Sequence, residues 1–357
     1  MKEIIAFHQL NDYSGSPKVL ANLLSGLAQN GYSITLYTSS GGILDKVPGI
    51  KRRNVSYSFS NFFIYSLFNF FKSNIQYFIR SLTERKGNKV IYINTILPFG
   101  AALGAKLRGH KIIYHCHENI LNKGSFYKFL GGIMAKTADK IICVSKHQQQ
   151  SLPCIDKSVI IPNALSTEFY NINPDINKAF EAKTILMLSS LKKYKGIDEF
   201  WKLANELPQY KFILVINDRL ENIENYFSQN KLPSLGNLEV YPSQENVVQF
   251  YQRASIVLNL SHKNLFIETF GLTAIEALAS GKPTIVPTMG GIAEIVENDF
   301  NGYKIDFNHI EEIKKKIIDL LSSREMYSRI ANNSLSLKSK YSKQEIVNRV
   351  IKVIEEV

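Results

Sequence analysis

Short apolar runs of strand length alternate with helical patterns along nearly the whole chain. Near the start, "KEIIAFHQL" is typical of a strand, "SPKVLANLLSGLAQNG" of a helix closed by Gly31, and "YSITLYTS" of a second strand. Repeated strand–helix–strand units with short connections predict a parallel, doubly wound sheet. Ligands of such sheets bind beyond the carboxyl ends of the strands, so polar residues directly after strands are candidates for a functional site.

The same alternation restarts in the second half with "KTILMLSS", "IDEFWKLANELP" and "YKFILVIND". A chain of 357 residues is also too long for a comfortable single core, so two domains are expected. A polar stretch rich in Asn and Pro separates the two patterns. We therefore expect an α/β protein with two Rossmann-like parallel-sheet domains, residues 1–165 and 166–340, facing a central cleft. The last segment, about 341–357, is helical by its period and can pack back on the first domain.

The positive charge of the chain is concentrated in the first domain. Residues 1–165 contain 20 lysines and arginines against 7 acids, whereas the rest of the chain contains 23 against 24. This asymmetry predicts that the first domain meets an anionic surface, and a general solubilising excess is the alternative. Because no helix-turn-helix, RNP-like or zinc pattern accompanies the charge, nucleic acid is not the expected partner.

Cysteine use and hydropathy bear on the location of the protein. The three cysteines form no CxxC motif and no close pair, which indicates a reducing compartment and neither a disulfide framework nor a zinc site. The first apolar run is short and lacks a small-residue cleavage site, so it is not expected to be a signal peptide. No stretch reaches the length of about 18–20 apolar residues that spans a bilayer. We expect a cytoplasmic protein.

An aromatic-rich stretch at residues 61–89 is followed by basic residues. Aromatic side chains with trailing cations suit a helix that lies in a membrane interface. The alternative is a helix that packs its aromatic face on the first sheet. Together with the charge of this domain, the pattern favours peripheral contact with an anionic membrane. The residues concerned are Phe62, Phe63, Tyr65, Phe68, Phe70 and Phe71, then Lys72, Arg80, Arg85, Lys86 and Lys89.

Two carboxylates eight positions apart flank a "TFGL" turn in "FIETFGLTAIEALASG". A helix is expected to begin near Leu272 or Thr273, which places Glu268 in the preceding loop and Glu276 about one turn inside the helix. The amides around Gly271 then lie at a helix N-terminus, where an anion such as a diphosphate is favoured. Glu276 can accept hydrogen bonds from a ribose, and Glu268 can reach the transferred group. The alternative is an ordinary capped helix with a solvated glutamate.

The E-x7-E spacing with "FG" inside, followed by "EALASGKPTIVPTMGGIAEIVENDFNGY", resembles the retaining glycosyltransferases of the GT-B fold, family 4 type. Other pieces agree in order and spacing over most of the chain. "SGSPKVLANLLSGLAQNGYSITLYT" is similar to the family's N-terminal Gly-rich loop and helix, and "YHCHE" to its acceptor-side His motif. "ADKIICVSKH" resembles the family's strand that ends in Ser, and "VIIPNAL" resembles its interdomain segment. "LSSLKKYKGIDEF" resembles its donor-phosphate Lys-Gly motif.

The resemblance implies a catalytic role for three residues. Glu268 would contact the donor sugar near the reacting centre, and His117 would lie at the reactive face of the sugar. Lys195 would neutralise the leaving diphosphate, which is electrostatic stabilisation of developing charge. Glu276 would bind the ribose hydroxyls of a nucleotide sugar. The other implied donor contacts are Phe270, Gly271, Leu272, Thr273, Gly15 and Ser16.

The "YHCHE" motif supplies the implied acceptor-side residues, His115 and Glu118. His115 alternates with His117, so their roles can exchange, and Glu118 either orients the ring or binds acceptor hydroxyls. A lone His after a strand can also be purely structural. The His-Cys-His-Glu cluster resembles a set of metal ligands as well. Because enzymes of this fold manage the leaving diphosphate with basic side chains and helix dipoles, neither a metal nor another cofactor is expected.

Two positions depart from the family pattern. Ser189 and Ser190 occupy the place of a usual Gly-Arg pair, so one of the two usual diphosphate cations is missing, and Lys192 or Lys193 can compensate. The N-terminal loop reads "GS" where two glycines are common.

The expected function is retaining transfer of a sugar from a nucleotide-diphosphate sugar to a lipid-linked saccharide in cell-surface polysaccharide biosynthesis, at the inner face of the membrane. A sugar-nucleotide 2-epimerase of the same fold and a non-catalytic partner subunit are the alternatives. The motifs leave open the base, the sugar, the linkage and the oligomeric state.

Overall fold

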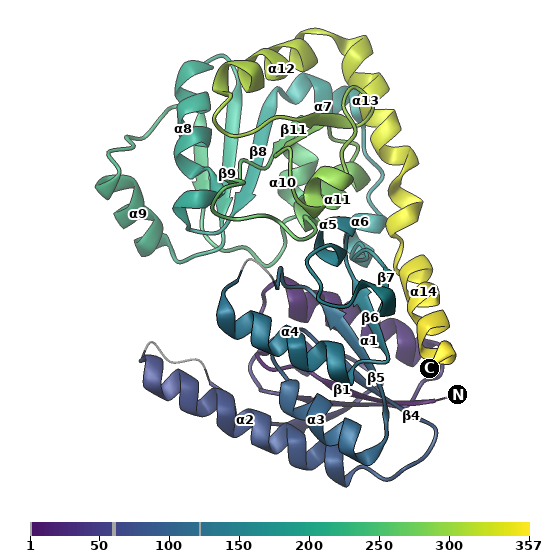
Figure 1. Ribbon diagram of the computed structural model, residues 1–357. Coiled ribbons are helices and arrows are strands. Elements are labelled where there is room, and N and C mark those ends of the chain that lie inside the picture. Colours follow the sequence, from purple (N-terminus) through teal and green to yellow (C-terminus); the bar gives the residue numbers. More distant parts are fainter. Residues whose placement is uncertain (1, 59–61, 121–122) are drawn as a thin grey trace. The chain divides into compact units, whose positions relative to one another are not determined.

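The computed structural model describes residues 2–58, 62–120 and 123–357, and the chain divides into two compact units. The first unit runs to Ala164 and also contains Ser342–Val357, and the second is Leu165–Tyr341. Each unit contains one sheet with helices around it (Figure 1). Every strand pair in both sheets is parallel, which confirms the predicted fold class.

The sheet of the first unit has seven strands in the order β3-β2-β1-β4-β5-β6-β7. The strands are β1 (Glu3–Phe7), β2 (Ile34–Thr38), β3 (Lys51–Asn54), β4 (Lys89–Asn94), β5 (Lys111–Cys116), β6 (Lys140–Cys143) and β7 (Ser158–Ile160). The α-helices are α1 (Gly15–Gln29), α2 (Phe63–Thr83), α3 (Phe99–Arg108), α4 (Ser125–Thr137), α5 (Lys146–Gln149) and α14 (Lys343–Glu356). Two 3₁₀ turns, η1 (Ile43–Lys46) and η2 (Ile155–Lys157), complete the unit.

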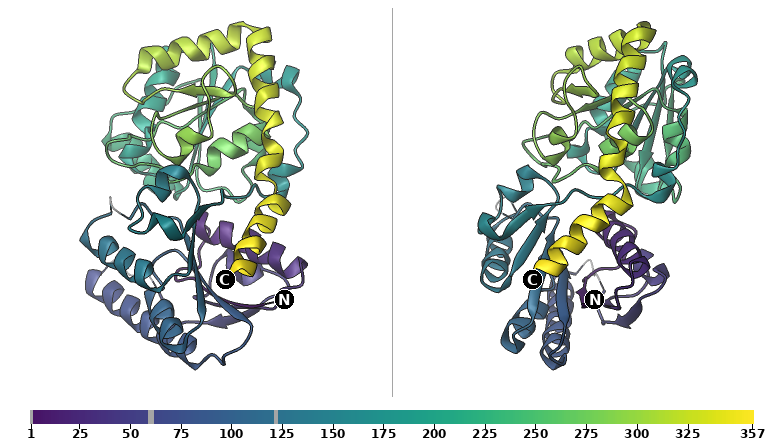
Figure 2. Two further views of the ribbon diagram at one scale, coloured as in Figure 1. Left: turned by 45° about the vertical axis from the view of Figure 1, so that its right-hand side comes forward. Right: turned by 90° about the vertical axis from the view of Figure 1, so that its right-hand side faces the viewer.

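The central strands of this sheet are apolar on both faces because helices cover both sides. Successive side chains of a strand point to opposite faces, so Ile4 and Ala6 of β1 pack with α1 and α14, whereas Ile5 and Phe7 pack with α2, α3 and α4. Figure 2 shows α14 in yellow alongside α1 in purple. The C-terminal helix therefore contributes to the core of the first unit.

The aromatic-rich stretch of the sequence forms α2, although Asn61 and the side chain of Phe63 lie outside the described residues. The helix buries some of its aromatic residues in the core of the first unit and leaves others exposed. Phe70 is buried, but Tyr65 and Phe68 are 67% and 64% exposed. Within the described part of the chain, no helix combines the length and the hydropathy that crossing a bilayer requires.

The sheet of the second unit has six strands in the order β10-β9-β8-β11-β12-β13. The strands are β8 (Thr184–Ser189), β9 (Lys211–Ile216), β10 (Leu238–Tyr241), β11 (Ile256–Leu258), β12 (Thr284–Val286) and β13 (Gly302–Lys304). The α-helices are α6 (Thr167–Tyr170), α7 (Ile176–Ala182), α8 (Ile197–Glu206), α9 (Leu220–Gln229), α10 (Val248–Arg253), α11 (Leu272–Ala279), α12 (Ile310–Ser322) and α13 (Arg324–Ser336). The 3₁₀ turns are η3 (Lys193–Lys195), η4 (Gly291–Glu294) and η5 (Lys338–Tyr341).

Helices α8 and α12 cover one face of the second sheet. Phe200 and Leu203 of α8 and Ile317 of α12 are fully buried in one cluster with Phe212 and Leu214 of β9. Each apolar face is removed from water only in contact with the sheet, and this burial is the main favourable term for the layered arrangement.

Helix α3 approaches α2 so closely that glycine is required at the contact. A Cβ atom on Gly104 would collide with the Ser81 side chain and the Phe78 carbonyl oxygen of α2. Gly132 of α4 is a matched contrast, because a Cβ atom there would meet nothing within 4 Å.

We predict that Gly104→Ala lowers the free energy of unfolding of the first unit by about 1–3 kcal/mol, the usual cost of overpacking. Gly132→Ala, the control, is expected to be neutral or slightly stabilising because alanine favours the helix. Urea denaturation followed by circular dichroism measures both. Equal stability of the two variants would contradict the close α2–α3 contact.

Candidate active site

Lys195 and Glu268 form an ion pair between two loops of the second unit. Lys195 ends the turn after β8, and Glu268 lies in the loop after β11. The Lys195 Nζ atom contacts Glu268 Oε1 and lies 4.0 Å from the ring centroid of Phe266. Both charged side chains are largely shielded, with exposures of 16% and 19%. The aromatic face and the carboxylate together hold the ammonium group in place.

The two loops are tied together beside this ion pair. The amide of His262 donates to the carbonyl oxygen of Tyr194 at 2.8 Å. The rings of Tyr194 and Phe266 stack with centroids 5.1 Å apart. These contacts fix the neighbours of Lys195 and Glu268 independently of the charges.

A third loop supports the backbone of Glu268. The amide of Gly291 donates to the Glu268 carbonyl oxygen at 2.8 Å. Gly290 has a φ of 99°, and a Cβ atom there would lie 2.6 Å from the same oxygen. Only glycine both adopts this conformation and permits this approach.

Helix α11 begins directly after the Glu268 loop. Gly271 precedes the helix with a φ of 102°, and a Cβ atom on it would collide with the side chain of Ile292. The first amides of a helix, here from Leu272 and Thr273, have no acceptor within the helix and favour an anion. Phe270 has its side chain buried, with 5% exposure. The "FGLT" segment thus presents backbone rather than a side-chain cluster.

Glu276 lies one turn inside α11 and is held by a buried tyrosine. The hydroxyl of Tyr251 donates to Glu276 Oε2 at 2.7 Å. Burial, together with the nearby carboxylate, raises the pKa of Tyr251 well above its usual value, so the hydroxyl remains a donor. This hydrogen bond fixes the orientation of the carboxylate on the side of the helix.

The positions that depart from the family pattern lie at the end of β8. Ser189 is the last residue of the strand, and its hydroxyl donates to the carbonyl oxygen of Ser190 at 3.0 Å. Lys192 and Lys193 are both exposed. Of the three lysines in this loop, Lys195 is the one held against Glu268.

In the first unit, His117 belongs to a chain of hydrogen bonds at the carboxyl ends of three adjacent strands. His8 follows β1, Asn94 ends β4 and His117 follows β5. His117 Nε2 lies 3.0 Å from Asn94 Oδ1, and Asn94 Nδ2 lies 3.0 Å from His8 Nδ1. His8 Nε2 in turn lies 2.9 Å from the carbonyl oxygen of Leu10.

This chain fixes which nitrogen of His117 carries the proton. Burial lowers the pKa of His8 to about 4 and that of His117 well below its usual value, so both rings are neutral near pH 7. The Leu10 carbonyl only accepts, so His8 Nε2 donates and His8 Nδ1 accepts from Asn94. The Asn94 oxygen then accepts from His117 Nε2. His117 Nδ1 is left as a hydrogen-bond acceptor.

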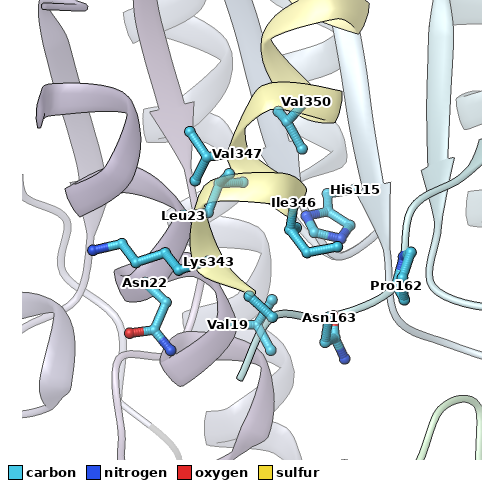
Figure 3. A pocket seen from close by; sticks show the side chains of 11 residues that line it. Val19, Asn22, Leu23, His115, Pro162, Asn163, Lys343, Ile346, Val347 and Val350 are labelled. Atoms are coloured by element: carbon cyan, nitrogen blue, oxygen red, sulfur yellow. The ribbon is translucent and has the colours of Figure 1, made fainter. Parts of the chain in front are cut away.

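His115 has a more enclosed environment than His117, although their ring centroids are 4.3 Å apart. Its Nδ1 atom lies 2.8 Å from the Tyr92 hydroxyl, and burial lowers its pKa to about 3. Figure 3 shows its ring beside Ile346 of α14, at a cavity of about 10 Å³ that Asn163 also lines. His115 is 3% exposed, and its Nε2 atom has no hydrogen-bond partner among the described residues.

Glu118 lies under the His117 loop and is 7% exposed. Its Oε2 atom accepts from the His117 amide at 3.2 Å, and burial raises the pKa of its carboxyl group. At the start of α1, Gly15 is exposed and Ser16 is half-buried. Across the described ranges, no three His, Cys, Asp or Glu side chains are grouped so that they could hold a metal ion.

Sequence reasoning missed several residues of these two sites. His8 and Asn94 stand at strand ends, the position that the parallel-sheet rule singles out, so the signal was present. Phe266 and Tyr251 are ordinary aromatic residues in sequence. Only the structure brings them to Lys195 and Glu276.

Two family models match consecutive parts of the chain. The model described as Glycosyltransferase Family 4 matches residues 13–169, and the model described as Glycosyl transferases group 1 matches residues 170–336. The chain belongs to the family 4 type of GT-B glycosyltransferases. The predicted family assignment is thereby confirmed.

Three similar proteins illustrate the relatives of this glycosyltransferase. An uncharacterized glycosyltransferase of Methanocaldococcus jannaschii is 26% identical over 328 residues, which cover 88% of this chain and 85% of that protein. The Campylobacter jejuni N,N'-diacetylbacillosaminyl-diphospho-undecaprenol alpha-1,3-N-acetylgalactosaminyltransferase is 24% identical over 48% of this chain and 44% of its own. The crystal structure of Anabaena HepE with UDP and glucose has a TM-score of 0.81 at 18% identity, with both chains fully covered.

The buried histidines predict a loss of stability in acid. Below pH 6.5 the unfolded chain takes up protons that His8 and His115 exclude until about pH 4 and 3, so the free energy of unfolding falls as the pH is lowered. Each such histidine contributes about 1.4 kcal/mol per pH unit in this window.

His115→Gln is expected to reduce the slope of the unfolding free energy against pH, between pH 6.5 and 4.5, by the contribution of one proton. Urea denaturation at a series of pH values measures this slope. His309→Gln, at an exposed position of the second unit, is the control and should keep the wild-type slope. A wild-type slope in His115→Gln would contradict the exclusion of a proton from this ring.

Proposed function

We propose that the protein is a retaining hexosyltransferase that uses a nucleotide-diphosphate sugar as donor and a saccharide as acceptor. One observation supports the donor site above all. The Lys195–Glu268 pair lies directly before α11, and Glu276 lies one turn inside that helix. A cation and helix amides, which can bind a diphosphate, are thus close to two carboxylates, which can accept hydrogen bonds from hydroxyl groups.

The proposed reaction forms one bond and breaks one at the anomeric carbon of the donor sugar. The bond from this carbon to the diphosphate oxygen breaks, and a bond to the acceptor oxygen forms on the same face. The acceptor hydroxyl's proton passes to the leaving phosphate oxygen, so no covalent nucleophile is required. Lys195 and the first amides of α11 stabilise the charge that develops on the nucleoside diphosphate, without a metal ion. Glu268 accepts a hydrogen bond from a sugar hydroxyl, and Glu276 binds the ribose.

The first unit would bind the acceptor at the carboxyl ends of its strands. His117 Nδ1, an acceptor in the neutral ring, would receive a hydrogen bond from a sugar hydroxyl. Glu118 and His115 would hold the loop and the ring of His117. Gly15 and Ser16, at the start of α1, would face the phosphate or the acceptor.

We further propose that the acceptor saccharide is carried on a lipid and that the protein works peripherally at the inner face of a membrane, in cell-surface polysaccharide biosynthesis. The name of the Campylobacter relative specifies a diphospho-undecaprenol acceptor. Residues 1–165 carry 20 basic against 7 acidic residues, which favours an anionic surface.

Glu268→Ala and Lys195→Ala are each expected to lower kcat at least about tenfold while the melting temperature shows an intact fold, which corresponds to about 1.4 kcal/mol of transition-state stabilisation. Lys192→Ala, an exposed lysine of the same loop, is the matched control and should retain near-normal turnover. Turnover is measured as release of nucleoside diphosphate. Near-normal kcat in either site variant would refute the role assigned to that residue.

A panel of UDP, GDP and ADP sugars tests donor binding. One of the three is expected to raise the melting temperature, because a ligand that binds the folded state at about 100 times its Kd adds about 2.7 kcal/mol. Release of nucleoside diphosphate should then require the acceptor. Release without any acceptor would favour an epimerase, and the absence of any donor-dependent shift would indicate a non-catalytic subunit.

A further inference from the structure

Helix α2 has its polar and apolar faces reversed relative to an ordinary surface helix. Its outward stripe consists of apolar residues spaced four, three, four and four positions apart, which places them on one helical face. The stripe residues are Ile64, Phe68, Phe71, Ile75 and Ile79, with exposures of 78%, 64%, 45%, 59% and 50%. The inward face carries Ser73, Asn74, Tyr77 and Ser81, all of them buried.

The inward polar groups of α2 are satisfied by hydrogen bonds. Asn74 Oδ1 accepts from the amide of Gly100, at the start of α3, at 2.9 Å. Ser73 accepts from the side chain of Gln9 at 2.9 Å, and the Tyr77 hydroxyl donates to the carbonyl oxygen of His8 at 2.9 Å. This arrangement is therefore a stable packing rather than a frustrated one.

Close packing on α3 explains why the large apolar residues face outward. Gly100 and Gly104 of α3 leave no room for a Cβ atom against the α2 backbone at Asn74 and Phe78. At these two glycines the contact has room only for small and polar side chains. The outward stripe consequently remains largely exposed.

A groove of about 280 Å³ continues the stripe between α2 and α3. Phe71, Ile75, Phe78, Phe99 and Leu103 line it. Helix α4 extends the apolar surface with Phe126 and Phe129, which are 42% and 62% exposed. The three helices lie side by side on one face of the sheet (Figure 1). A contiguous apolar surface of this kind marks an interaction site.

The charged residues of α2, α3 and α4 favour one kind of partner for this surface. The sequences of α2, α3 and α4 contain no Asp or Glu. They carry six basic residues, Lys72, Arg80, Lys106, Arg108, Lys128 and Lys136, all exposed. A second copy docked on the same face would bring these cations together, which is unfavourable. An anionic bilayer accepts both features, because its headgroups attract the cations and its acyl chains receive the apolar side chains.

We propose that the outer face of α2, the groove between α2 and α3, and the adjoining face of α4 form the membrane-docking surface of the protein. The stripe lies in the interface of an anionic bilayer, acyl chains fill the groove, and the lysines and arginines reach the headgroups. This inference rests on the proposed function, because a lipid-linked acceptor would require the protein to dock on a membrane.

The test is sedimentation with phosphatidylcholine vesicles, with and without phosphatidylglycerol. The full-length protein should bind the anionic vesicles, and binding should weaken as salt is added. Phe68→Ser/Ile75→Ser should reduce the partition coefficient at least tenfold because two apolar side chains no longer enter the interface. Leu220→Ser/Ile318→Ser, at apolar positions of the second unit that are 51% and 40% exposed, is the matched control and should bind as the wild type does.

Two outcomes would overturn the docking surface: equal vesicle binding by the stripe variant and the wild type, or a wild-type dimer that the stripe variant dissociates. A protein partner that binds this face in place of anionic vesicles would overturn it as well. The donor-dependent rise in melting temperature separates this inference from the proposed reaction, since the stripe variant should retain it. Lost vesicle binding with an intact donor response supports the surface, and a wild type that binds vesicles but no donor refutes only the reaction.

Discussion

Each unit depends on a sheet in which all strands run in one direction. Parallel strands emerge at the same edge, so the loops that follow them gather there whatever their distance in the sequence. In the first unit this edge brings together His8, Asn94 and His117 from three adjacent strands. In the second unit, the loops after β8 and β11, two neighbouring strands, bring Lys195 to Glu268. The chemistry of both sites is thus a consequence of strand order.

The two sites are organised by different kinds of interaction. The site in the second unit, proposed for the donor, combines an ion pair with glycines that let three loops meet at backbone distance, so its charges are held in fixed positions. The histidine site contains neutral rings and an amide, and its order comes from hydrogen bonds between buried groups. Removing a charged side chain is expected to disturb the ion-pair site. Changing the protonation of a ring is expected to disturb the histidine site.

The fold, and the placement of Glu268 in a loop and Glu276 in the helix after it, could be predicted from the sequence because both are local. Apolar periodicity gives the strands and helices, and the glutamates around "TFGL" lie within ten residues of each other. The sequence marks His8 and Asn94 as residues at strand ends, but it does not show that they meet, because that contact depends on the pairing of β1 with β4. The orientation of α2 could not be predicted either. Its period shows two faces, but Gly100 and Gly104 on another helix decide which of them turns inward.

The amide of Asn94 has one oxygen and one NH₂ group, and it lies between two imidazole rings. A proton added to His8 would make both of its nitrogens donors, so the amide would have to turn its oxygen toward His8. Its NH₂ group would then face His117 Nε2, and the proton of that ring would have to move to Nδ1. The side of His117 that accepts a hydrogen bond is therefore set by the protonation of a residue more than one hundred positions away in the chain.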